Sequence, residues 1–318
     1  MGTTRWSDDH YRARAAHRRA TGTSAFDYND DIRAQRVAAR VNPLMDPSKL
    51  REGIRESRDS ETHPQSNAVA VLFDVTGSMH AVPRMLQQNL CTLFNLLLRH
   101  EYLTDPAVLV GGIGDATCDL APLQVGQFEA GNEIEDDLGR LFLEGGGGGQ
   151  KSESYELALY FLARKTSLDC YSRRGQKGYA FLIGDELPYR KVKRREVQHV
   201  FGDKLKSDIP IQQIIDEARQ MYEIYYILPN LTSYYDDPQI LDCWRGLLGQ
   251  HVLRLDDPSG ISELIASTIG LSKNAVDWSD LSGDLHQAGT SKDVAGAVAS
   301  ALTPIRSGDL HGTGLTHF

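Results

Sequence analysis

The sequence predicts an α/β fold: a doubly wound, mostly parallel central sheet flanked by helices, with an N-terminal arm and a C-terminal tail. One observation is the unbroken apolar run 68–73, which is typical of a strand buried on both faces. A second is the sharp change after this run to Asp74, Thr76 and Ser78, which an apolar-periodic segment follows directly. A third is the alternation of strand-like and helix-like segments, joined by short loops, through the rest of the chain.

Hydrophobic spacing predicts the elements that follow the opening strand. Segment 82–100 carries apolar residues at helical spacing and is predicted to be one helix packed on the sheet. Segments 107–114 and 120–128 are predicted to be the next strand and an antiparallel edge strand. Further helices are expected over 134–143, 154–166, 211–221, 238–248 and 258–271, and further strands over 179–183, 222–228 and 251–255.

Composition divides the chain into an arm (1–66), a central domain (67–271) and a C-terminal extension (272–318). The arm has 12 Lys or Arg against 10 Asp or Glu, whereas the rest has 22 against 33. We therefore expect the arm to lie on the acidic domain or on a neighbouring subunit of a homo-oligomer, with a nucleic-acid-binding tail as the alternative. Segment 31–41 could form a helix in the arm. The extension is expected to hold one helix, 292–302, before a tail that is free or docks on a partner.

The bulk composition narrows the classes of function. A net charge of −9 disfavours a general nucleic-acid binder, which leaves only the arm for such a role. No apolar run approaches the roughly 20 residues that a membrane span requires, and the first residues hold no apolar secretory segment. The four cysteines lie far apart, which indicates reduced thiols. We therefore expect a cytoplasmic protein.

The loop after the first strand carries hard oxygen ligands. Asp74, Thr76 and Ser78 alternate, so one turn of backbone can point all three side chains the same way. A carboxylate with two hydroxyls suits Mg²⁺, which prefers oxygen ligands and retains several waters. The alternative is that Asp74 and Ser78 only cap the following helix.

This loop, Asp74-Val-Thr-Gly-Ser-Met79, resembles the metal-ion-dependent adhesion site (MIDAS) of von Willebrand factor A (VWA) domains, especially the bacterial intracellular type. The strand 181–183, followed by Gly184 and Asp185, is similar to the third loop of that site. The resemblance covers roughly 67–270 and leaves both ends of the chain outside it. It implies a Rossmann-like fold and a bound Mg²⁺, or Mn²⁺ or Ca²⁺, held by Thr76 and Ser78, with Asp74 and Asp185 acting directly or through water.

The resemblance also implies a second, glycine-rich loop that runs into a helix. Counting back from Ala158-Leu159 places Glu153 where the family usually has Thr, with Ser154 beside it. Either residue could fill that position. A Glu153 that bound the cation directly would add negative charge and weaken the need of the site for an acidic partner. At the end of the second strand, Asp115, Thr117 and Asp119 either cap a turn or lie near the site.

The same glycine loop, 145–152, superficially resembles a phosphate-binding loop, GxxxxGK[ST]. That pattern requires glycine at position 150, where this chain has Gln150. It also requires a buried strand before the loop, whereas segment 134–143 has helical spacing. A nucleotide hydrolase is therefore the less favoured alternative.

The sequence thus predicts a protein-binding adaptor that is not an enzyme, with no catalytic triad indicated by residue spacing. The resemblance implies that the cation binds an acidic side chain of a protein partner. By analogy with bacterial intracellular VWA proteins, the partner could be an AAA+ ATPase that assembles or remodels complexes. A structural subunit with a vestigial metal site is the other alternative.

Overall fold

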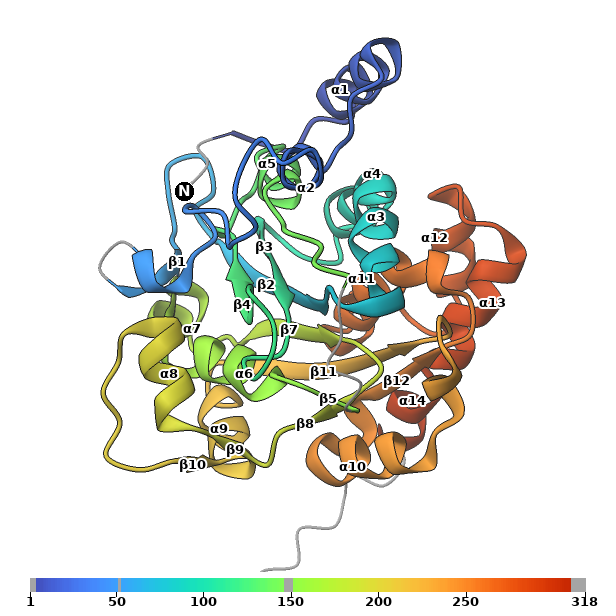
Figure 1. Ribbon diagram of the computed structural model, residues 1–318. Coiled ribbons are helices and arrows are strands. Elements are labelled where there is room, and N and C mark those ends of the chain that lie inside the picture. The colour runs from blue at the N-terminus through green and yellow to red at the C-terminus, as the bar shows by residue number, and fades with distance from the viewer. Residues whose placement is uncertain (1–3, 51–52, 146–150, 310–318) are drawn as a thin grey trace, which may run out of the picture.

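A central sheet of six strands organises the protein (Figure 1). The computed structural model describes residues 4–50, 53–145 and 151–309. The strand order is β4-β3-β2-β7-β11-β12, with β4 antiparallel to β3 and the other neighbours parallel, so the predicted fold class is confirmed. The strands are β2 (Asn67–Asp74), β3 (Pro106–Ile113), β4 (Leu123–Val125), β7 (Gly178–Ile183), β11 (Tyr222–Pro229) and β12 (Val252–Leu255).

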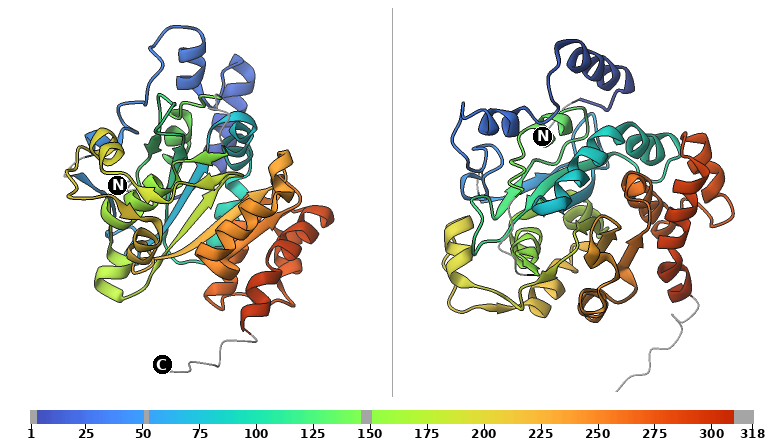
Figure 2. Two further views of the ribbon diagram at one scale, coloured as in Figure 1. Left: turned by 60° about the horizontal axis from the view of Figure 1, so that its bottom comes forward. Right: turned by 45° about the vertical axis from the view of Figure 1, so that its right-hand side comes forward.

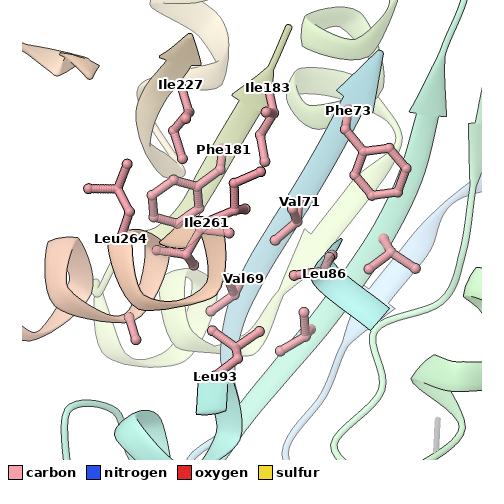
Figure 3. Packing of buried hydrophobic residues seen from close by; sticks show 14 of the residues in the cluster. Val69, Val71, Phe73, Leu86, Leu93, Phe181, Ile183, Ile227, Ile261 and Leu264 are labelled. Atoms are coloured by element: carbon pink, nitrogen blue, oxygen red, sulfur yellow. The ribbon is translucent and has the colours of Figure 1, made fainter. Parts of the chain in front are cut away.

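Helices cover both faces of this sheet. On one face, Val69, Val71 and Phe73 of β2 point toward leucines and isoleucines of the covering helices, as Figure 3 shows. That face is covered by α3 (Ala81–Gln88), α4 (Leu90–Phe94), the π-helical turn η4 (Asn95–Arg99), α5 (Ile134–Gly139) and α11 (Ile261–Ser272). The opposite face is covered by α6 (Tyr155–Arg164), α9 (Ile211–Ala218) and α10 (Pro238–Leu248). Strand β2 is buried on both sides, as its apolar run requires.

The predicted helix 82–100 is divided into α3, α4 and η4. The first break falls at Asn89, whose φ of −108° and ψ of 15° leave the helical range. The Asn89 side-chain amide donates a hydrogen bond to the carbonyl of Ser259 (3.1 Å), next to α11. The break therefore ties this layer of helices to the loop that starts α11.

The topology creates a switch point between β2 and β7. From β2 the chain moves outward through β3 and β4, then crosses back to β7 on the other side of β2. The connections leaving β2 and β7 run in opposite directions, so the strand order reverses between their carboxyl ends. Ligands of doubly wound α/β proteins bind at this place.

The arm lies on its own domain. It contains α1 (Asp8–Thr21), α2 (Asp27–Arg33) and β1 (Arg55–Ser57). Trp6 stacks on Phe94 with ring centroids 4.3 Å apart. From α1, Arg18 pairs with the buried carboxylate of Glu135 (3.0 Å), and Arg14 pairs with Asp136. The basic arm therefore rests on the acidic helix α5, next to which Figure 1 shows α1 and α2.

The predicted helix 31–41 is wrong, because α2 ends at Arg33 and the chain turns at Gln35, whose φ is 57°. Burial of Phe26 sets the position of α2 instead, since only 2% of that residue is exposed. The later part of the arm is fixed by β1, which pairs in parallel with β6 (Thr166–Leu168). Ion pairs join Arg58 to Asp169 (2.8 Å) and Arg174 to Asp59 (2.6 Å) beside this pairing.

The C-terminal extension forms three helices: α12 (Leu281–Gln287), α13 (Lys292–Ala301) and α14 (Thr303–Asp309). Figure 2 shows these red helices beside β12, away from the blue arm. The sequence predicted α13. It did not predict α12 and α14, because helices of seven residues are too short to show hydrophobic periodicity. Ten of the twelve residues of α11 are buried, because the extension covers the side that faces away from the sheet. Within the described ranges, no helix is long and apolar enough to cross a bilayer.

A buried carboxyl group lies beneath α8 (Arg194–Phe201). Glu156 of α6 is fully buried, and its two carboxyl oxygens have no hydrogen-bond partner among the described residues. Burial, and next the nearby carboxylate of Glu196, raises the pKa of Glu156 well above its usual value, while Lys193 opposes this. The folded protein therefore holds a proton on Glu156 that the unfolded chain releases.

We predict that Glu156→Gln changes how stability depends on pH. In the wild type, the raised pKa means that stability is lost as pH rises above about 4.5, by at most about 1.4 kcal/mol per pH unit. The variant lacks this loss, so its advantage over the wild type should grow as the pH rises above about 4.5. Urea unfolding across that range measures it, with Glu61→Gln, at an exposed position, as the control. A constant difference at all pH values would contradict the prediction.

We also predict that Trp6→Ala loosens the arm and leaves the sheet intact. Loss of the Trp6–Phe94 stack should remove about 1 kcal/mol or more of docking energy. Limited trypsin digestion should then cut the arginines of α1 faster, while thermal unfolding of the domain changes little. The control is Leu44→Ala, because Leu44 lies in the arm and is 62% exposed. Equal cleavage rates in the two variants would show that the stack does not hold the arm.

Candidate functional site

The first loop of the site begins where β2 ends. Asp74 is the last residue of β2 and is 1% exposed. The loop then turns through Gly77, whose φ of 47° favours glycine, into the short helical turn η3 (Gly77–His80). Ser78 lies in this turn, and its side chain is outside the described part. The sheet therefore positions Asp74 and Thr76 rigidly at the switch point.

A hydroxyl group joins two carboxyl groups in this loop. Asp74 Oδ1 accepts hydrogen bonds from the backbone N–H of Thr76 (2.7 Å) and from Thr76 Oγ1 (2.6 Å). Thr76 Oγ1 also lies 3.0 Å from Glu153 Oε1. Because one hydroxyl has one hydrogen to donate, the two carboxyl groups share it. Asp74 and Glu153, 79 residues apart in sequence, are thus brought to opposite sides of Thr76.

The second loop presents Glu153, and Ser154 has another role. Glu153 is 3% exposed and belongs to β5 (Ser152–Glu153), which pairs in parallel with β8 (Leu187–Pro188) of the third loop. The hydroxyl of Ser154 accepts a hydrogen bond from the backbone N–H of Ala116 (2.9 Å). Ser154 therefore links α6 to the loop after β3, which leaves Glu153 as the residue facing Thr76.

The third loop brings Asp185 close to the first loop. Asp185 is 4% exposed and accepts a short hydrogen bond from the hydroxyl of Thr232. Its negative charge contributes to the raised pKa of Asp74. The preceding Gly184 is required by packing, because a Cβ there would lie 1.8 Å from the hydroxyl oxygen of Tyr155. Tyr155 is itself buried beneath the site.

Sequence reasoning missed several neighbours of the site. Thr232 follows β11, Glu186 follows Asp185, and Tyr155 starts α6. Asp115 and Asp119 cap the turn after β3: Asp119 Oδ2 accepts from the backbone N–H of Asp115 (2.7 Å). Asp119 also lies close enough to raise the pKa of Asp74 and Glu153. Asp115 and Asp119 were not missed, because their position at the carboxyl end of β3 had indicated either a turn cap or a place near the site.

The carboxyl groups of the site repel one another and are poorly solvated. Burial, followed by Asp74, raises the pKa of Glu153, and burial, opposed by the bonds from Thr76, raises that of Asp74. Burial and then Asp74 raise the pKa of Glu186 to about 8. Asp74 Oδ2 and Glu153 Oε2 are buried and have no hydrogen-bond partner in the described chain. Two such oxygens beside a threonine hydroxyl fit the oxygen chemistry of a hard divalent cation.

Carboxyl groups alone do not form a metal site among the described side chains. No three His, Cys, Asp or Glu side chains in the described part form a group that could hold a metal ion. The donor set is instead two carboxyl groups and a hydroxyl, with Asp185 farther away. The glycine loop adds no phosphate-binding geometry in its described part. Lys151 is paired with Asp237 (2.5 Å), and Ser152 lies in β5; residues 146–150, including Gln150, are outside the described residues.

Comparison with known proteins gives only weak likenesses. No protein-family model matches the chain, and no curated protein matches its sequence. A von Willebrand factor type A structure from Catenulispora acidiphila is similar at 15% identity and a TM-score of 0.37, over 65% of this chain and 42% of that one. The pilus adhesin SpaC from Lactobacillus rhamnosus GG is similar at 12% identity and a TM-score of 0.43, over 76% and 31%.

Proximal thread matrix protein 1 from the mussel byssus is similar at 10% identity and a TM-score of 0.40, over 65% of this chain and 46% of that one. The chain therefore spans less than half the length of each of these structures. Values this low establish no family. What the fold and site define is a doubly wound α/β protein with a carboxylate and hydroxyl site at its switch point.

We predict that Asp74→Asn and Glu153→Gln each stabilise the cation-free protein. Each change removes one of two buried carboxyl groups that compete for the Thr76 hydroxyl. The gain at neutral pH should be about 1 to 2 kcal/mol, as is common when a strained functional site is neutralised. Thermal and urea unfolding in chelator measure it. Asp242→Asn, on α10 and outside the site, is the control. A loss of stability in both variants would contradict the prediction.

Proposed function

We propose that this protein is a VWA-like protein-binding module whose switch-point site holds a divalent cation and, through it, a partner. The observation that carries the proposal is a pair of buried oxygens, Asp74 Oδ2 and Glu153 Oε2, that have no hydrogen-bond partner among the described residues and belong to the two carboxyl groups bonded to Thr76. Burying carboxyl oxygens without partners is costly, so such groups mark sites that something else completes. The position at the carboxyl edge of the sheet supports the same function.

The residues that would hold the cation are Asp74, Thr76 and Glu153, with Ser78 as a further predicted ligand. Asp185 would act through water, because the hydroxyl of Thr232 already donates a hydrogen bond to it. A cation bound there supplies an electrophile for an oxygen ligand of a partner. Mg²⁺ or Mn²⁺ suits the mixed carboxylate and hydroxyl set, and Ca²⁺ is the alternative.

Glu153 sets the charge that a partner would meet. With Asp74 and Asp185, it gives three carboxyl groups around one divalent cation, which weakens the attraction for an acidic side chain. We therefore expect Glu153→Thr to strengthen the binding of an acidic partner and Asp74→Asn to abolish it. The partner is proposed to be a protein that supplies Asp or Glu, with an AAA+ ATPase of the cytoplasm as one candidate by analogy alone.

We predict that the protein binds one Mg²⁺ or Mn²⁺ and that Asp74→Asn and Thr76→Ala abolish this binding. Titration calorimetry measures the binding directly. Cation at about 100 times its dissociation constant should raise the free energy of unfolding by about 2.7 kcal/mol in the wild type and by nothing in the two variants. Asp9→Asn, on the exposed arm, is the control and should bind like the wild type.

Equal cation binding by the wild type and Asp74→Asn would contradict the proposal that the switch-point site holds the cation. The alternative of a structural subunit with a vestigial site would then be favoured. Capture of partners from host extract, with and without chelator and with Asp74→Asn, separates these two functions. A partner retained in chelator and by the variant belongs to the structural alternative.

A further inference from the structure

A strongly basic segment interrupts this acidic protein between β9 (Lys191–Val192) and β10 (Ile209–Pro210). Residues 190–208 hold seven Lys or Arg and three Asp or Glu, although the whole chain has a net charge of −9. The two strands pair antiparallel, and α8 lies between them in sequence. The segment therefore leaves the domain at β9 and returns to it at the neighbouring strand β10.

The three acidic residues of this segment already have partners within the chain. Glu196 pairs with Lys193 (2.8 Å), and Asp203 pairs with Lys165 of the neighbouring α6 end (2.7 Å). Asp208 accepts a hydrogen bond from the backbone N–H of Arg194 (3.0 Å). Six exposed cations remain without an ion-pair partner in the described chain, and we call them the basic patch: Arg190, Lys191, Arg194, Arg195, Lys204 and Lys206.

The patch is supported by a packed helix and follows the third loop of the candidate site in sequence. Val197, Val200 and Phe201 bury the inner face of α8, which leaves Arg194 and Arg195 on its exposed first turn. The third loop leads directly from Asp185 through β8 to Lys191, so these residues are at most about 22 Å apart. Figure 1 shows β8 and β9 following one another along the lower edge of the molecule.

We propose that the basic patch is a docking surface for an acidic segment of a protein partner. Unpaired cations on a fixed scaffold attract a run of carboxylates and accelerate its association. Each exposed pair contributes about 0 to 1 kcal/mol, so several must form together, and added salt must weaken them. This surface acts beside the switch-point site and needs no cation.

Other polyanions fit the patch less well. Single-stranded nucleic acid binds through aromatic stacking as well as charge. The aromatic side chain nearest the patch, Tyr189, is occupied: its hydroxyl donates to Asp115 (2.9 Å), and Lys193 lies over its ring. A membrane surface would require apolar side chains between the cations, and the apolar residues of α8 point inward. Within 190–208, the one exposed ring is that of His199, and Phe201 is buried, so the patch is dominated by charge, which matches an acidic protein segment.

The test uses the full chain and a fluorescent glutamate-rich peptide, followed by anisotropy. Arg194→Glu combined with Arg195→Glu should weaken binding at least about tenfold, because two attractive charges become repulsive. This variant should fold, since acidic residues are favoured in the first turn of a helix. Lys273→Glu combined with Lys292→Glu makes the same change in net charge on exposed residues elsewhere and should bind within about twofold of the wild type.

Raising the salt from about 0.05 M to about 0.3 M should weaken peptide binding by the wild type at least about tenfold. These measurements are made in chelator, so that no cation at the switch-point site can bind the peptide, and failure of the patch and failure of the metal site then give different results. Equal loss in the two double variants would overturn the proposal. An oligothymidylate bound more tightly than the peptide, with the same dependence on Arg194 and Arg195, would also overturn it in favour of nucleic acid.

Discussion

The hydrogen-bonded group formed by Asp74, Thr76 and Glu153 is the interaction on which the site depends. Two buried carboxyl groups beside one hydroxyl repel each other, so the surrounding structure must hold them in place. Strand β2 does this for Asp74, because it lies in the middle of the sheet between β3 and β7. The pairing of β5 with β8 does it for Glu153 and also fixes the third loop. One small cluster thus joins all three loops.

Much of the fold and part of the site could be predicted because their signals are local. The apolar run before Asp74 marks a central strand, and helix α10 begins as predicted at Pro238, where Asp237 caps it. Thr232 could not be predicted, because only the packing of β11 beside β7 brings it to Asp185. Segment 31–41 is helical only as far as Arg33, because the chain turns at Gln35, whose φ is 57°.

The charges of the chain are distributed unevenly over its surface. Carboxyl groups gather at the ends of β2, β3 and β7, while the arm brings arginines onto the acidic helix α5. The basic patch follows the third loop of the acidic site in sequence. A net charge of −9 therefore conceals regions of opposite sign, and uneven charge distributions of this kind steer the approach of charged molecules.

The last strand of an open sheet has backbone groups on one side that no neighbouring strand binds, and the C-terminal extension packs against this strand. Strand β12 is hydrogen-bonded to β11 on one side, and α13 packs against it. An uncovered strand at this position is a template for pairing with another chain, and α11 would add a large apolar surface. Residues 272–309 therefore protect the last strand and α11 from contact with other chains as well as extending the fold.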